Sequence, residues 1–269
     1  MADATRDLFV KKSFVVITGA SRGLGKCIAS KLVANLPRSS FFLFLSRNNA
    51  AQEIVASELS TSYPGAQIGS CKFDQGHLDQ NIFDTLFTDV IKKHDLNVGD
   101  FEQAVIVHNC ATVGDVSKYA WEMMEVASLQ KFFDVNVTGM ILLNSAFFKT
   151  FSGTKSRLIV NMTSDNSKIP YPTMSTYCAS KSARDMYFRV LALEDPSIRV
   201  LSYSPGPCDT DMLANVRDKS SNKEFADDIK KFYSEGKVLT CDTSADKLVA
   251  VLRKNTFKNA EHVEYDDPL

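Results

Sequence analysis

Short apolar segments alternate with longer amphipathic ones along most of this sequence. The short segments are rich in aromatic and β-branched residues, as strands are, whereas apolar residues recur at helical spacing in the segments between them. Two of the expected strands, Phe41–Ser46 and residues 104–107, are apolar at nearly every position, which is typical of strands covered on both faces. Because parallel strands are joined by helical crossovers, the alternation predicts an α/β fold: a doubly wound Rossmann-type domain with a parallel sheet of about seven strands and helices on both faces.

The expected elements follow one another without a linker or an internal repeat. Residues 1–269 are therefore expected to form a single domain, with a cofactor half at 13–115 and a catalytic and substrate half at 116–269. We expect strands at 13–18, 41–46, 67–73, 104–107, 157–162, 198–203 and 261–265. We expect helices at 22–36, 52–62, 78–93, 129–151 and 176–194, then a polar segment at 209–222 and two shorter helices.

The overall charge and the cysteines exclude several classes of protein. A formal net charge of −1 gives no reason to expect nucleic acid or an anionic membrane as a partner, and no apolar run approaches the ~20 residues that span a bilayer. The six cysteines are scattered without metal-ligand spacing, which disfavours both a zinc site and a disulfide framework. The first twelve residues mix acids and bases, unlike a secretory signal. We expect a cytoplasmic protein with reduced thiols, no metal and a small-molecule partner.

A glycine-rich segment, TGASRGLG at residues 18–25, stands between the first expected strand and the first helix. The free N–H groups and positive dipole end of a helix N-terminus attract anions such as a pyrophosphate. Gly19 suits a tight turn, Gly23 leaves room for the pyrophosphate, and Gly25 allows close packing of helix on strand. The segment therefore predicts a dinucleotide site. Its expected cofactor contacts are Gly19, Ser21, Arg22, Gly23, Leu24 and Gly25.

The end of the second strand distinguishes the two nicotinamide cofactors. An NAD site has an acid there for the ribose 2′-hydroxyl, whereas a 2′-phosphate requires arginine. This strand runs into Arg47, and no acid occurs before Glu53. Arg47, together with Arg22, can present guanidinium forks to a phosphate. Although both could be merely solvated, the missing acid favours NADPH/NADP+.

A tyrosine and a lysine stand one helical turn apart near the start of the helix at 176–194. Tyr177 and Lys181 share a helix face at i and i+4. A free phenol has a pKa of about 10, and a nearby ammonium should lower it. Ser164 follows the fifth strand and is expected at the same edge of the sheet, where it could hold a carbonyl oxygen while Tyr177 protonates it. A surface tyrosine–lysine pair is the alternative.

Taken together, TGxxxGxG, Ser164, the YxxxK pair and Pro205-Gly206 resemble the short-chain dehydrogenase/reductase family over nearly the whole chain. The resemblance implies that Asn136 is a fourth catalytic residue, which supports Lys181 through water; a helix-kinking or capping amide is the other interpretation. It also implies that Lys181 holds the nicotinamide ribose and that Asp74 faces the adenine. The further cofactor contacts it implies are Asn48, Asn109, Pro205 and Gly206.

The family's NNAG motif stands here as His108-Asn109-Cys110-Ala111. Asn109 is retained, whereas Ala111 replaces a glycine, which questions how closely the backbone approaches the cofactor there. We interpret His108 as a packed histidine at the end of a strand and assign it no catalytic role.

Stretches outside the general motifs narrow the resemblance. Residues 177–186, 190–194 and 204–212, with shorter matches at 46–48, 114–118 and 262–264, resemble the branch of the family that reduces pterins. The resemblance implies NADPH-dependent reduction of pterin side-chain carbonyls in tetrahydrobiopterin biosynthesis by a homodimer. Glu264 stands where that branch has a substrate-anchoring aspartate, with Asp266 as the second candidate. An exposed acid without function is the alternative for Glu264.

Two other functions remain open. One is a reductase of the same family for another ketone, such as a steroid, diketone or quinone; the polar segment 209–222 and Glu264 disfavour a steroid pocket. The other is a catalytically silent NADP-binding regulatory protein. Such a protein is expected to lose Tyr177 or Lys181, and both are present.

Overall fold

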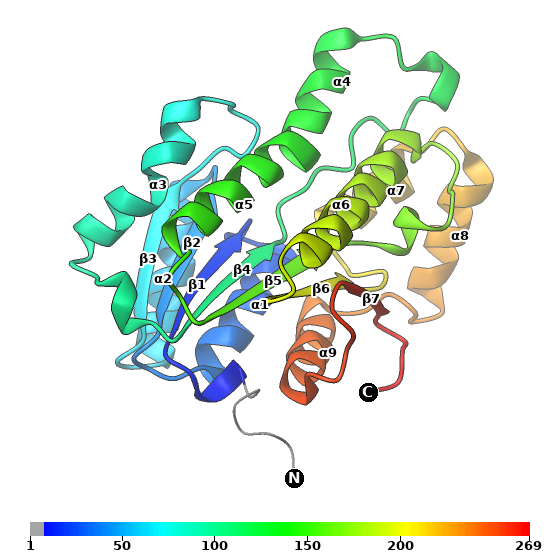
Figure 1. Ribbon diagram of the computed structural model, residues 1–269. Coiled ribbons are helices and arrows are strands. Elements are labelled where there is room, and N and C mark those ends of the chain that lie inside the picture. The colour runs from blue at the N-terminus through cyan, green and yellow to red at the C-terminus, as the bar shows by residue number, and fades with distance from the viewer. Residues whose placement is uncertain (1–7) are drawn as a thin grey trace.

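The computed structural model describes residues 8–269 and contains one seven-stranded parallel sheet, in the order β3-β2-β1-β4-β5-β6-β7 (Figure 1). The predicted fold class is confirmed, and each strand lies within one residue of its predicted bounds at either end. Residues 1–7, part of the segment judged unlike a secretory signal, lie outside the described residues. The strands are β1 Ser13–Thr18, β2 Phe41–Ser46, β3 Gln67–Lys72, β4 Gln103–His108, β5 Ser156–Met162, β6 Ile198–Ser204 and β7 Glu261–Glu264.

The helices agree with the prediction except in two places, the polar segment 209–222 and the long helix at 129–151. Their bounds are α1 Gly23–Asn35, α2 Asn49–Ser62, α3 Gln80–Lys93, α4 Val126–Phe133, α5 Gly139–Thr150, α6 Ser175–Glu194, α7 Asp211–Lys219, α8 Lys223–Ser234 and α9 Cys241–Lys254. Among residues 8–269, none of these helices has both the length and the apolar character needed to cross a bilayer. All six cysteines are free thiols in the structure.

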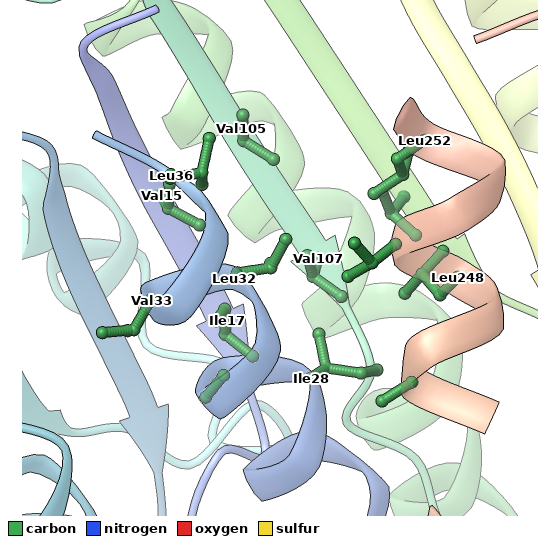
Figure 2. Packing of buried hydrophobic residues seen from close by; sticks show 14 of the residues in the cluster. Val15, Ile17, Ile28, Leu32, Val33, Leu36, Val105, Val107, Leu248 and Leu252 are labelled. Carbon is green, nitrogen blue, oxygen red and sulfur yellow. The ribbon is translucent and has the colours of Figure 1, made fainter. Parts of the chain in front are cut away.

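Helices cover both faces of the sheet, which explains the apolar strands. Every residue of β1, β2 and β4 is buried. On one face, Ile28 and Leu32 of α1 and Leu248 of α9 pack against Ile17 and Val107 (Figure 2). On the other face, α3, α5 and α6 enclose a second apolar cluster. Since side chains of a strand alternate between the two faces, a strand between two helical layers is apolar at consecutive positions.

The polar segment 209–222, for which the sequence pattern predicts no helix, contains α7. Thr210 caps this helix by accepting a hydrogen bond from the N–H of Leu213. Val216 is buried, and Met212 and Leu213 pack partly buried in the same small apolar cluster. The apolar stripe is narrow and interrupted by charged residues, so the average polarity of the segment concealed its helical spacing.

The helix predicted at 129–151 is interrupted by a π-helical turn, Asp134–Thr138. A neighbouring loop explains the interruption, because the side-chain Nε2 of Gln75 donates a 2.6 Å hydrogen bond to the carbonyl of Val135. A side group inserted into the hydrogen-bond ladder of a helix commonly produces such a turn. Gly139, the next residue, lies against the backbone of Gln75.

The contact between Gly139 and Gln75 leaves no room for a methyl group. A Cβ at Gly139 would lie 1.7 Å from the carbonyl oxygen of Gln75, so backbone must move. We predict that Gly139→Ala lowers the free energy of unfolding by about 1–3 kcal/mol, the usual cost of overpacking. Denaturant unfolding measures this loss. Gly153→Ala is the matched control, since a Cβ there meets no atom within 4 Å; equal stability of the two variants would contradict the prediction.

Candidate active site

The carboxyl ends of the strands open onto a cleft of about 1620 Å³. Segments from both halves of the chain line it, from the glycine-rich loop after β1 to the residues that follow β7. In open α/β sheets, ligands bind at this edge. The predicted site residues that line the cleft are Gly19, Ser21, Arg22, Gly23, Leu24, Gly25, Arg47, Asn48, Asn109, Ser164, Tyr177, Lys181, Pro205, Gly206, Glu264 and Asp266.

The glycine-rich loop forms a cradle that larger residues cannot make. Gly19 and Gly23 adopt positive φ angles of 72° and 53°, a region that favours glycine. A Cβ at Gly25 would lie 2.2 Å from the carbonyl oxygen of Gly19. Asn109 braces the loop by donating a 2.9 Å hydrogen bond from Nδ2 to the carbonyl of Thr18. No side chain caps the N-terminus of α1, so this cradle fits the anionic phosphates of a dinucleotide.

Ala111 does not disturb the cradle. Gly114 has a positive φ, but Ala111 is not among the residues with one. The backbone at this position therefore does not require a glycine, and its approach to the cofactor stays a prediction.

The two candidate arginines differ in their surroundings. Arg47 is exposed at the end of β2 and makes no side-chain hydrogen bond or ion pair with residues 8–269. Arg22 instead forms an ion pair with Asp211 at the start of α7. Asn48 caps α2 by accepting a hydrogen bond from the N–H of Ala51. Arg47 is therefore the more available of the two guanidinium groups.

The contact of Asp74 with adenine stays a prediction. Its neighbours Phe73 and Gln75 line the cleft, whereas Asp74 does not. The Asp74 carboxylate is engaged in a local turn, because it accepts a 3.0 Å hydrogen bond from the N–H of Gly76. A cation that sequence reasoning missed, Lys72, lines the cleft at the end of β3. The sequence could have indicated this residue, because it lies at the carboxyl end of a predicted strand, where ligands of such sheets bind.

The candidate catalytic residues Tyr177 and Lys181 lie on the buried face of α6, as their spacing predicted. Tyr177 is 8% exposed and Lys181 is 3% exposed. Lys181 Nζ lies 5.4 Å from the centroid of the Tyr177 ring and donates a 2.6 Å hydrogen bond to the carbonyl of Met162. Ser164 lines the same cleft, with its hydroxyl donating to Asp165 Oδ1 at 2.9 Å. The tertiary structure thus brings the three predicted side chains to one cleft.

The prediction that Lys181 lowers the pKa of Tyr177 is wrong for this structure. Burial raises the pKa of Tyr177 well above its usual range, and the neighbouring Arg184 opposes this only in part. Burial, and then the same arginine, lowers the pKa of Lys181 well below its usual range. A low-polarity environment disfavours the charged form of either group. The protein therefore holds Tyr177 as a protonated phenol at neutral pH, which is the form that a proton donor needs.

Asn136 lies in the π-helical turn and does not line the cleft. Its side chain is buried and exchanges two 2.8 Å hydrogen bonds with the backbone of Thr112, and it also donates to Ser180 Oγ at 3.2 Å. It makes no direct hydrogen bond to Lys181. The geometry agrees with the second interpretation, an amide at a helix irregularity, and its action on Lys181 through water stays a prediction.

Arg184 is a buried cation that sequence reasoning missed. It is 0% exposed and donates hydrogen bonds to Asn161 Oδ1 at 2.9 Å and to the carbonyl of His108 at 2.6 Å. Burial lowers its pKa to about 10. The sequence could have indicated that Arg184 is buried, because it follows Lys181 by three residues and therefore lies on the same face of the helix. The arginine therefore ties α6 to the ends of β4 and β5.

His108 has the packing role that the sequence suggested. Its ring is 1% exposed, lies 3.2 Å from Asn144 Oδ1 through Nε2, and packs on Phe188. Burial, followed by the charge of Arg184, lowers its pKa to about 3. A histidine that stays neutral at physiological pH and does not line the cleft fits a structural role.

Glu264 lies at the end of β7 with its carboxylate held by two side chains. Its Oε1 lies 2.7 Å from His262 Nε2 and 3.4 Å from Lys168 Nζ. Burial alone would raise its pKa, but the contacts with His262, Ser204 and Lys168 together outweigh burial and lower the pKa to about 2. Asp266 lines the cleft as an exposed residue. Glu264 is therefore the better ordered of the two candidate anchors.

Removal of the buried guanidinium tests how strongly α6 depends on it. Arg184→Met keeps the size of the side chain but leaves Asn161 Oδ1 and the His108 carbonyl without their charged donor. We predict a loss of about 2–4 kcal/mol in the free energy of unfolding, since buried acceptors without partners are costly. Arg189→Met, an exposed arginine of the same helix, is the control. The prediction fails if the two variants unfold at the same denaturant concentration.

Comparison with known proteins agrees with this geometry. A sequence profile of the family described as short chain dehydrogenase matches residues 13–221. A short chain dehydrogenase/reductase structure from Saccharomyces cerevisiae shares the fold, with a TM-score of 0.78 and 22% identity over 96% of this chain and 97% of that one. The chain therefore belongs to the short-chain dehydrogenase/reductase family, as the motifs predicted. Its members are oxidoreductases that act on carbonyl and CH–OH groups and bind NAD or NADP.

Curated relatives fall into more than one group. The sepiapterin reductase of Rattus norvegicus is 34% identical over 254 residues, which cover 94% of this chain and 95% of the relative. The benzil reductase ((S)-benzoin forming) of Bacillus subtilis is 28% identical over 253 residues, which cover 90% of this chain and 93% of the relative. The predicted similarity to the pterin-reducing branch is confirmed at the level of sequence.

Proposed function

We propose that this protein reduces side-chain carbonyls of pterins, such as those of sepiapterin and 6-pyruvoyl-tetrahydropterin, with NADPH in tetrahydrobiopterin biosynthesis. The observation that carries the proposal is the shared cleft: Tyr177, Lys181 and Ser164 line it together with the glycine-rich loop and Glu264. The 34% identity to a sepiapterin reductase over most of the chain supports the choice of substrate.

The charges along the cleft support one orientation of its ligands. Arg47, directly after β2, and Lys72, the last residue of β3, give that end of the cleft a positive charge, as a phosphorylated ribose requires. Glu264, at the other end of the sheet, offers a carboxylate to N–H donors such as those of a pterin ring. The reacting carbonyl would then lie between these ends, beside Tyr177.

Protein groups supply the proton in the proposed reaction. Bound NADPH would provide the hydride that is added to the carbonyl carbon. The Tyr177 phenol donates its proton to the carbonyl oxygen, which yields the alcohol and leaves a phenolate. Lys181 and Arg184, which lie on the same face of α6, are placed to stabilise that negative charge. Ser164 must turn its hydroxyl from Asp165 to the substrate to hold the oxygen.

A second candidate is the reduction of diketones. Tyr171 and Phe225, whose ring centroids lie 5.4 Å apart, line the cleft together with Met174. Such an apolar wall also suits an aromatic diketone, and benzil reductases are among the relatives. The silent regulatory protein is the least favoured function, because Tyr177 and Lys181 are both present and line the cleft.

The similarity to the pterin-reducing branch of the family also suggests how the chain is divided between cofactor and substrate. We assign the cofactor to residues 13–115 and the catalytic and substrate-binding groups to residues 116–269. The resemblance also favours a cytoplasmic homodimer.

The reaction can be tested by the consumption of NADPH with sepiapterin and, in parallel, with simple diketones. We predict turnover of sepiapterin by the wild-type protein, and a decrease of about 10²–10⁴-fold in Tyr177→Phe, since general acid catalysis contributes that much. Binding of NADPH, followed by its fluorescence, should persist in the variant. Turnover of diketones alone would favour the second candidate, and unchanged turnover in Tyr177→Phe would overturn the mechanism.

The cofactor assignment depends on Arg47. We predict that Arg47→Ala raises the KM for NADPH about tenfold or more, since a charge-assisted bond to the 2′-phosphate is lost, while the KM for NADH changes little. Arg38→Ala is the control, because Arg38 is exposed before β2, at the opposite edge of the sheet. An equal change for both cofactors would refute a 2′-phosphate site at Arg47.

A further inference from the structure

Three ionisable side chains form a continuous array behind the substrate end of the cleft. His262 lies on β7 between two carboxylates: its Nδ1 is 2.9 Å from Asp185 Oδ2, and its Nε2 is 2.7 Å from Glu264 Oε1. Asp185 and His262 have side chains that are 15% and 12% exposed, whereas that of Glu264 is 32% exposed. The array thus begins inside the protein, on α6, and ends at the cleft.

The contacts of His262 favour a charged histidine. Its Nδ1 is hydrogen-bonded to Asp185, and its Nε2 lies at ion-pair distance from Glu264 but without the geometry of a hydrogen bond. An imidazolium attracts both carboxylates, whereas a neutral imidazole has no charge to pair with either. Burial disfavours the charge on His262, but the contacts with Asp185 and Glu264 outweigh burial and raise its pKa to about 9. Asp185 is ionised as well. Burial raises its pKa, but its hydrogen bonds, of which the one with His262 has the largest effect, outweigh burial and lower the pKa.

The two carboxylates face different spaces. Glu264 lines the large cleft, whereas Asp185 and His262 line a separate cavity of about 200 Å³ together with Lys168 and Arg189. Asp185 is held from behind by Asn161, whose Nδ2 donates to Asp185 Oδ1 at 2.8 Å. Asp185 is therefore a fixed support for the imidazolium, and only Glu264 can meet a ligand in the cleft.

A glutamate anchor needs such support more than an aspartate does. Its longer side chain has an additional rotatable bond, and ordering that bond on binding costs entropy. His262 and Lys168 both contact Oε1 of Glu264, so neither of these cations engages the second oxygen. The contacts hold the carboxylate in one place before a substrate arrives.

We propose that Asp185 and His262 are positioning residues that orient the Glu264 carboxylate for substrates with a paired N–H edge, such as the aminopyrimidinone ring of a pterin. The inference rests on the proposed function, in which Glu264 is the substrate anchor. It adds a structural reason why this chain can use a glutamate as its anchor, and it identifies His262 as a determinant of specificity that does not touch the reacting carbonyl.

The first test separates substrate binding from catalysis. We expect His262→Gln to raise the KM for sepiapterin about tenfold, the effect of losing one partly buried ion pair, with little change in kcat. The KM for diacetyl, a diketone without an N–H edge, and the affinity for NADPH should not change. Glu261→Gln is the control, since Glu261 lies on the same strand outside the cleft and its oxygen can still accept the N–H of Lys258. An unchanged KM for sepiapterin, or equal losses for both substrates, overturns the inference.

The pH dependence provides a second readout. Because the pKa of His262 is raised, its support of Glu264 is complete at neutral pH and is lost as the pH rises through about 9. The charged groups around it are Asp185, Glu264, Lys168 and Arg189. The KM for sepiapterin in the wild-type protein should rise over that interval, whereas the KM in His262→Gln should not show the same step. The same step in both proteins contradicts a role for His262.

A third measurement does not depend on activity. NMR titration of the His262 ring should give a pKa near 9 in the wild type and a clearly lower one in Glu264→Gln, which lacks one of the two carboxylates.

A wild-type protein that reduces diacetyl but not sepiapterin overturns the proposed function. A protein that reduces sepiapterin but whose His262 titrates at its usual pKa, or at the same pKa in Glu264→Gln, overturns this inference alone.

Discussion

The hydrogen bonds of one buried guanidinium join α6 to the sheet. Arg184 donates to Asn161 of β5, to the carbonyl of His108 at the end of β4, and to the carbonyl of Cys110 in the loop that follows. A buried cation is stable only where such acceptors surround it. Since Lys181 and Tyr177 precede Arg184 on the same face of α6, the bonds that fix the arginine also fix the position of both candidate catalytic side chains.

This burial determines the protonation of the site as well as its shape. Burial in a low-polarity environment raises the pKa of Tyr177 and lowers that of Lys181, which leaves a neutral proton donor in the middle of the cleft. At the end of the cleft near β7, Glu264 and His262 retain opposite charges because each partner compensates for the burial of the other. The cleft therefore has Arg47 and Lys72 near one end, a protonated phenol at its centre and the Glu264 carboxylate near the other end, and this order supports the proposed orientation of the ligands.

Several features of the fold were predictable because they depend on local pattern. The central strands β1, β2 and β4 were predictable because both of their faces are covered, and covered strands are apolar at consecutive positions. The helix at 211–219 was missed because charged residues interrupt its apolar stripe. The π-helical turn at 134–138 was missed because its cause is the side chain of Gln75, which belongs to a distant loop.

The sequence by itself determined the parallel sheet, the glycine cradle and the pairing of Tyr177 with Lys181, because each arises from residues close together in the chain. Only the tertiary structure decided that the Asp74 carboxylate accepts a hydrogen bond from the N–H of Gly76 and that burial, not the neighbouring lysine, governs the pKa of Tyr177. The contact between Asp185 and His262 joins residues 77 positions apart. Burial and long-range hydrogen bonds depend on which elements pack together, and no local spacing encodes that arrangement.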